Sequence, residues 1–114
     1  MTSARKAHGA FGEELVARWY EREGYEVLAR NWRSRTGELD LVLGRGRLVV
    51  FCEVKARSTT AYGSPFEAVG VTKQARIRKL GMEWLAATGV HGRELRFDVA
   101  AVLSGKVEVL EAAF

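Results

Sequence analysis

Hydrophobic and polar residues change their spacing several times along this chain, and each spacing predicts a different element. From residue 9 to residue 23, apolar side chains recur at helical intervals, and Gly24 follows where a C-terminal cap is expected. Three shorter apolar runs come next. They predict strands at residues 25–29, 39–43 and 48–56, with a basic connection at residues 30–35 between the first two.

The second half of the chain returns to a helical spacing and then to strands. A polar loop at residues 58–64 and a short helical turn at 65–69 lead into a longer helix at 73–88. Thr72 is the expected N-cap of this helix, and Gly89 is its expected C-terminal stop. Two further strands are predicted at residues 95–103 and 107–110.

The order of these elements, α-β-β-β-α-β-β, predicts an α/β fold in which a mixed sheet carries helices on its faces. The strand at 48–56 is apolar on both faces as far as Glu53, as expected of a central strand that is covered on both sides. A length of 114 residues suits one domain with a modest core. We therefore expect a single domain over residues 1–114, with residues 1–8 flexible.

Composition narrows the class of protein without identifying it. The chain is 47% hydrophobic and 28% charged, which is usual for a globular protein. It has no apolar run of about 18 residues and no apolar leader core, so we expect no membrane span and a cytoplasmic protein. The lone Cys52 lies in an apolar run and is interpreted as a buried thiol outside any disulfide. The net charge of +4 permits a polyanionic partner but does not require one.

Candidate chemistry is concentrated in residues 37–57, where three charged residues interrupt two apolar runs. Glu53 and Lys55 are two positions apart on one strand, so their side chains project from the same face. If the turn at residues 44–47 makes the two runs neighbours, Asp40 reaches that face as well. Charges at the ends of apolar strands are costly unless they hold a metal or a substrate. We interpret them as a divalent-metal site beside a lysine.

Such a site suits the hydrolysis of a phosphodiester. Asp40, Glu53 and the backbone carbonyl of Val54 offer oxygen ligands for Mg²⁺, which polarises a phosphate and lowers the pKa of a bound water. Lys55 can stabilise the negative charge of the pentavalent phosphorane or orient the attacking water. The alternative interpretation is that these charges lie at the edge of the sheet and pair with Lys55 or with arginines from the loops.

Four other carboxylates are open to more than one interpretation. Glu38 competes with Asp40 for the same face, and we rank Asp40 first because it lies deeper in the apolar run. Glu13 lies near the flank of the first helix's apolar stripe, where it can approach the sheet as a third acid or serve as a carboxylate near the helix N-terminus. Glu14 is expected in solvent. Asp98 either pairs with an arginine or belongs to a site.

Basic residues gather before the second strand, after Lys55 and along the second long helix, and Trp32 is interleaved with the first group. Such groups suit phosphate contacts, and the alternative is a solvated surface. The two histidines have no ligand-spaced partners for zinc, and no nucleotide-binding glycine motif is followed by a helix. The residues we assign to nucleic-acid binding are Arg30, Arg33, Arg57, Lys73, Gln74 and Arg76.

The motifs GELD and FCEVKAR resemble the core of the PD-(D/E)xK nuclease superfamily. More closely, the chain is similar nearly from end to end to the YraN-like family of small predicted endonucleases, which are related to archaeal Holliday-junction resolvases. The stretches that carry this likeness are FGEELVARWYEREGYEVLARNWR, GELDLVL, LVVFCEVKAR, FEAVGVTKQARIRKLGMEWLA and LRFDVAAV with the closing AAF. Their joint order and spacing make the resemblance specific.

The resemblance implies a restriction-endonuclease-like fold and metal-dependent hydrolysis of DNA. It implies that Asp40 and Glu53 bind Mg²⁺ or Mn²⁺, that Lys55 is catalytic, and that Glu13 is the first-helix acid of resolvase-like members. It places Lys73-Gln74 where several related nucleases carry a polar side chain near the site. We expect branched or junction DNA as substrate and a homodimer, since cutting paired strands suits two copies. The alternative is a non-catalytic nucleic-acid-binding or assembly protein that retains the fold.

Overall fold

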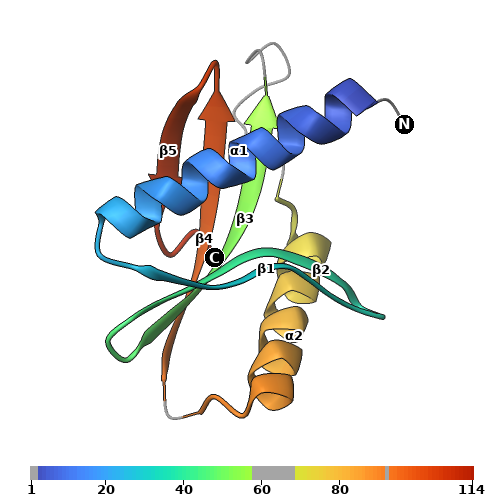
Figure 1. Ribbon diagram of the computed structural model, residues 1–114. Coiled ribbons are helices and arrows are strands. Elements are labelled where there is room, and N and C mark those ends of the chain that lie inside the picture. Colours follow the sequence, from blue (N-terminus) through green and yellow to red (C-terminus); the bar gives the residue numbers. More distant parts are fainter. Residues whose placement is uncertain (1–2, 58–68, 92) are drawn as a thin grey trace.

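The computed structural model describes residues 3–57, 69–91 and 93–114, and it describes side chains at residues 10–56, 69–91 and 93–114. Within these residues, five strands form one sheet in the order β1-β2-β3-β4-β5, and the two helices precede β1 and β4 (Figure 1). The order α-β-β-β-α-β-β is the predicted one. The elements are α1 (Ser3–Arg22), β1 (Glu26–Ser34), β2 (Gly37–Arg45), β3 (Leu48–Arg57), α2 (Val71–Thr88), β4 (Glu94–Leu103) and β5 (Lys106–Leu110).

Neighbouring strands are antiparallel except at the centre of the sheet, where β3 and β4 run parallel. A parallel pair needs a crossover connection, because a tight turn only reverses the chain. α2 is the helix of this crossover. It packs against one face of the sheet, while α1 crosses the opposite face (Figure 1). The predicted mixed sheet with helices on its faces is confirmed.

The hydrophobic core consists of two clusters, one on each face of the sheet. β3 contributes to both, because Val50 and Cys52 face α1 whereas Val49 and Phe51 face α2. This alternation confirms the central, doubly covered position predicted for the strand, and Cys52 is buried and free, as predicted. Each fully buried aliphatic side chain contributes roughly 1.5–3 kcal/mol. Helix residues supply Val16, Ala17 and Tyr20 to the α1 side, and Ile77, Leu80 and Trp84 to the α2 side.

β1 extends to Ser34, so most of the predicted basic connection is in fact a strand. The partly buried positions of β1 include Ala29 and Trp32 rather than a single alternating set, because the strand is kinked between them. Asn31 lies at the kink with a φ of 49°, in a left-handed region that asparagine tolerates better than most residues. The kink shifts the period-two pattern by one residue, which explains why the sequence did not reveal the whole strand.

The helix ends agree with prediction in one case and differ in others. α2 begins at Val71 after an N-cap at Gly70 that makes no side-chain capping bond, so the prediction of Thr72 as N-cap was wrong. Gly89 ends the helix as predicted, with a φ of 73° and its N–H donated to the carbonyl of Leu85. α1 begins at Ser3, six residues before the predicted start.

Some expectations fall on parts of the chain that the structure does not describe. The predicted loop at 58–64 lies outside the described residues, and so does the predicted helical turn apart from Val69, which is buried and non-helical. Neither described helix combines the length and the apolar character that crossing a bilayer requires.

Candidate functional site

The candidate site lies where β2 separates from β3. The pairing of β2 with β3 ends at Leu41 and Cys52. Asp40 is the neighbour of Leu41 on β2 and lies just beyond this last pair. There the backbone N–H of Val54 donates a 2.8 Å hydrogen bond to Oδ2 of Asp40. The carboxylate therefore takes the place that a carbonyl of the neighbouring strand would otherwise fill. Because a strand residue exchanges both of its hydrogen bonds with one neighbour, the carbonyl of Val54 lies at the same edge.

The kink of β1 also affects the position of Asp40. Arg30 pairs with Leu41 and Trp32 pairs with Leu39, but the pairing is interrupted between them, where Asn31 and Asp40 lie. Leu39 and Leu41 consequently belong to clusters on opposite faces of the sheet. Asp40 thus occupies a local break in both of its strand pairings, and its side chain lies in the gap where β2 and β3 stop pairing.

The partly buried Asp40 and the buried Glu53 form an interacting pair of carboxyl groups. Burial raises the pKa of Asp40 to about 9, with further contributions from its hydrogen bond to Glu53 and from the charge of Glu53. Burial also acts to raise the pKa of Glu53, but hydrogen bonds from Asp40 and Lys73 outweigh it and the pKa is lowered. Near neutral pH the raised pKa of Asp40 favours its protonated form beside an ionised Glu53.

Two lysines lie next to this pair. Nζ of Lys73, in the first turn of α2, is 2.9 Å from Oε2 of Glu53, and its side chain also contacts Lys55. Glu53 and Lys55 therefore project from the α2 face together, as predicted. Burial lowers the pKa of Lys55, and the adjacent Lys73 lowers it further. The pKa of Lys73 is raised, because its bonds to Lys55 and Glu53 outweigh its own burial.

Glu13 and Glu38 approach Asp40 from the other side of the gap. One carboxylate oxygen from each of these three residues lies within 4.8 Å of the other two. Burial raises the pKa of Glu13, against a hydrogen bond from Asn31 that lowers it, and the charges of Glu38 and Glu53 raise it further. Glu13 thus faces the sheet, and Glu38 lies beside Asp40, so the two carboxylates that competed in the sequence converge in the structure.

The close approach of α1 depends on Gly12. A Cβ atom at this position would lie 2.9 Å from the Cβ of Ala56 on β3, closer than such atoms pack. The missing side chain therefore lets the helix lie directly on the sheet and brings the next residue, Glu13, to the gap. Four carboxylates then meet two lysines: Glu13, Glu38, Asp40 and Glu53 with Lys55 and Lys73.

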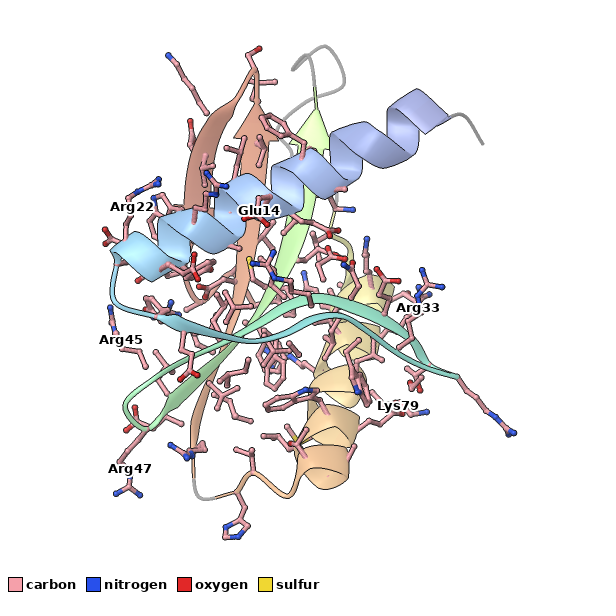
Figure 2. All side chains as sticks on the ribbon, in the orientation of Figure 1. Glu14, Arg22, Arg33, Arg45, Arg47 and Lys79 are labelled. Carbon is pink, nitrogen blue, oxygen red and sulfur yellow. The ribbon has the colours of Figure 1, made fainter. Side chains whose placement is uncertain are left out.

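The residues assigned to nucleic-acid binding are not gathered in one place. Arg30 pairs with Glu14 and Arg33 pairs with Glu38, at 2.8 Å and 2.6 Å. Nε2 of Gln74 donates to the carbonyl of Val69, which leads into α2. Arg57 is the last residue of β3, and Arg76 is exposed on α2. In Figure 2, Arg33 and Lys79 lie on the right of the view, near α2. Arg22, Arg45 and Arg47 lie on the left of the view, away from α2.

Asp98 lies outside this cluster and is a structural residue. It is fully buried and accepts hydrogen bonds from Tyr20, from the backbone N–H of Ala112 and, twice, from Arg96. The open choice between an arginine pair and a site role is thus decided in favour of the pair.

Sequence reasoning missed Asn31 and placed Lys73 near the site only through the resemblance. Asn31 is placed by the kink, for which the sequence offers no periodic signal, although asparagine itself tolerates the left-handed backbone. Lys73 was assigned to nucleic acid and lies directly on Glu53. The resemblance carried a signal for it, because Lys73-Gln74 matched a helix position near the site in related nucleases.

Oxygen ligands from carboxylates are the donors that hard divalent cations prefer, and this chain offers no sulfur or imidazole at the gap among its described residues. The residues therefore fit Mg²⁺ or Mn²⁺ better than zinc. One oxygen each from Glu13, Glu38 and Asp40 lies within 4.8 Å of the other two, a spacing that one cation could bridge.

Fold and site together define a small α/β domain whose carboxylates and lysines meet at a split in the sheet. The family model described as uncharacterised protein family UPF0102 matches residues 12–102, and the chain belongs to this family. This is the YraN-like family that the sequence resembles, so the predicted family is confirmed.

Relatives in this family cover most of the chain. A UPF0102 protein of Beutenbergia cavernae is 54% identical over 88% of this chain and 85% of its own length. One from Rhodococcus jostii is 52% identical over 87% of this chain and 84% of its own. One from Acidothermus cellulolyticus is 46% identical over 98% of this chain and 96% of its own. Their printed names identify the family and state no activity.

Proposed function

We propose that this protein is a metal-dependent nuclease that hydrolyses DNA phosphodiester bonds in the cytoplasm, during repair or recombination. The observation that carries the proposal is the convergence of carboxylates at a break of the sheet: oxygens of Glu13, Glu38 and Asp40 lie within 4.8 Å of one another, with Glu53 and Lys55 beside them. A fold gains no stability from gathering like charges, so this arrangement favours a role in binding and catalysis.

Each side chain has a distinct role in this proposal. Asp40, Glu53 and the carbonyl of Val54 would hold Mg²⁺ or Mn²⁺, with Glu13 and Glu38 adding negative charge beside them. When bound, the cation supplies Lewis-acid stabilisation of phosphate charge and a more acidic water. Lys55 donates hydrogen bonds to the negative charge that develops on the phosphorus oxygens, or orients the attacking water. Its lowered pKa brings it closer to the neutral form that orienting a water requires.

DNA is the proposed substrate because the chain is basic overall and presents cations around the acidic gap. Phosphate contacts from Arg30, Arg33, Arg57, Lys73, Gln74 and Arg76 would position the backbone without reading sequence. Arg30 and Arg33 would exchange their present partners, Glu14 and Glu38, for phosphates. Branched or junction DNA remains the candidate shape, with two copies of the chain acting on paired strands.

A second candidate is a nucleic-acid-binding or assembly protein that retains the fold without catalysis. One observation favours it: an internal cation, Lys73, already occupies Glu53. A site that is filled by its own side chain can bind a polyanion without ever taking up a metal.

The test incubates the protein with Mg²⁺ or Mn²⁺ and linear, flapped and four-way-junction DNA. We expect cleavage by the wild type, and a loss of at least about 10²-fold in an Asp40→Asn, Glu53→Gln variant, as for removal of one electrostatic catalytic group. A Glu108→Gln variant, which changes an exposed carboxylate on β5, is the control and should retain activity. Cleavage that survives in the double variant would contradict the assignment, and binding without cleavage under both metals would favour the second candidate.

A further inference from the structure

Lys73 is the cation that the structure places on Glu53. Its side chain is 36% exposed, whereas that of Glu53 is 9% exposed, so the ammonium reaches from the surface of α2 into the gap. Glu53 is also one of the carboxylates that would hold a metal. An ammonium at 2.9 Å and a divalent cation on the same carboxylate would repel each other strongly, because both charges lie within a few bond lengths in a partly buried site.

Lys55 makes this competition sharper. Its side chain contacts Lys73, and the acidic groups around both lysines keep the two cations together. A divalent cation would neutralise those acidic groups and leave the two ammonium groups repelling each other. Lys73 is the one able to move, because it lies on a flexible four-carbon stem in the first turn of α2, at the protein surface.

We propose that Lys73 is an internal counter-ion that occupies Glu53 until a DNA phosphate attracts it away, so that metal and DNA bind cooperatively. This inference rests on the proposed function and adds a form of regulation to it. A phosphate offers Lys73 the same charge and hydrogen-bond acceptors as Glu53 does. DNA would therefore free Glu53 for a metal and, by linkage, a metal would strengthen DNA binding by the same factor.

Calorimetric titration with Mn²⁺ alone tests the first half of this inference. Replacing Lys73 with methionine removes the competing charge, and we expect Mn²⁺ to bind at least about fivefold more tightly than in the wild type. Removing the charge of Lys73 also strengthens proton binding by the carboxyl pair. A divalent cation gains twice as much electrostatic energy from this removal as a proton does. Lys73→Gln should behave like Lys73→Met, and Lys73→Arg, which keeps the charge, should behave like the wild type.

Lys79→Met is the matched control, because it removes one ammonium from an exposed position of the same helix. Mn²⁺ affinity should be unchanged in this variant. Circular dichroism and thermal melting of all variants separate a binding effect from a folding defect. An Mn²⁺ affinity that is the same in Lys73→Met, Lys73→Gln and the wild type would overturn the inference.

Fluorescence anisotropy with a labelled four-way junction tests the second half, with Ca²⁺ as the cation. In the wild type, Ca²⁺ should raise DNA affinity by a factor about ten times larger than in the Asp40→Asn variant. A coupling of this size is usual for two linked ligands. In Lys73→Met the gain should fall to about threefold or less, because only direct contact between cation and phosphate remains. An undiminished gain would overturn the inference.

The same data separate this inference from the proposed function. If the wild type binds Mn²⁺ and DNA and Asp40→Asn abolishes Mn²⁺ binding, the site is real, and only the behaviour of the Lys73 variants decides the inference. If the wild type binds no Mn²⁺ with or without DNA, the proposed function fails, and the role of Lys73 fails with it.

Discussion

Two buried carboxylate sites in this protein have opposite surroundings. Asp98 is fully buried, and the groups that contact it are donors: the hydroxyl of Tyr20, the guanidinium of Arg96 and the N–H of Ala112. Asp40 accepts one backbone N–H, from Val54, and otherwise faces other carboxylates. The first site is complete within the chain, whereas the second has more negative charge than its own donors satisfy.

This difference separates a structural carboxylate from a candidate binding site. Asp98 joins α1, β4 and the C-terminal segment through short hydrogen bonds of 2.7 to 3.0 Å, so its burial is compensated. The carboxyl groups at the gap have partners as well, among them Arg33 and two lysines that contact each other, yet burial and the neighbouring Glu53 still raise the pKa of Asp40. A group that becomes stable only with an added cation is expected at a site of function.

The largest effect on folding is expected from Asp98→Ala. The substitution leaves the guanidinium of Arg96 and the hydroxyl of Tyr20 without their buried partner, which costs about 3–5 kcal/mol for a broken buried pair. Urea unfolding monitored by circular dichroism measures this loss. Glu108→Ala on β5 is the control and should change the free energy of unfolding by less than about 0.5 kcal/mol. If Asp98→Ala also changed the free energy of unfolding by less than about 0.5 kcal/mol, the two sites would not differ in kind.

A smaller effect is expected from Gly12→Ala, which acts on both sites through α1. The new Cβ overlaps Ala56, and relieving this contact costs about 1–3 kcal/mol, partly offset by the better helix propensity of alanine. Because Glu13 follows directly, metal binding at the gap should weaken as the helix shifts. The double variant Gly12→Ala, Ala56→Gly removes the overlap and should restore both properties. Restored stability without restored metal binding would argue against a role for Glu13.

An effect of opposite sign is expected from Asp40→Asn. Burial holds the pKa of Asp40 near 9 in the folded protein, above its ordinary value, so the folded state binds more protons than the unfolded state between these values. Its contribution to stability is complete at low pH and is lost as pH rises toward 9. An amide mimics the protonated acid, so without metal Asp40→Asn should melt higher than the wild type, with a margin that grows from pH 6 to pH 8. A margin that shrinks over this range would contradict the raised pKa.

Much of the fold was predictable because it depends on local periodicity. The apolar run at residues 48–56 reads as a buried strand whatever surrounds it, and Gly89 can end a helix because it adopts a left-handed backbone without strain. The pairing of Glu53 with Lys55 on one face followed from strand alternation alone. These features need no knowledge of how distant segments pack.

The remaining parts of the site depend on packing between distant segments, which periodicity does not encode. Glu13 reaches Asp40 only because Gly12 lets α1 lie on β3, and Glu38 converges with them where β1 and β2 are kinked at Asn31. Lys73 reaches Glu53 only because the crossover connection brings the start of α2 to the face of the sheet from which Glu53 projects. The resemblance to nucleases indicated two of these residues, but not their contacts.

Calorimetric titration with Mn²⁺, repeated in buffers of different ionisation enthalpy, tests the central claim most directly. If Asp40 and Glu53 share a proton that a cation replaces, wild-type protein at pH 7.5 should bind Mn²⁺ and release close to one proton, a number that follows from one shared site. Asp40→Asn should bind Mn²⁺ at least about tenfold more weakly and release fewer protons, since it has lost a charged ligand. Binding that is unchanged by Asp40→Asn, or no binding at all in the wild type, would contradict the account.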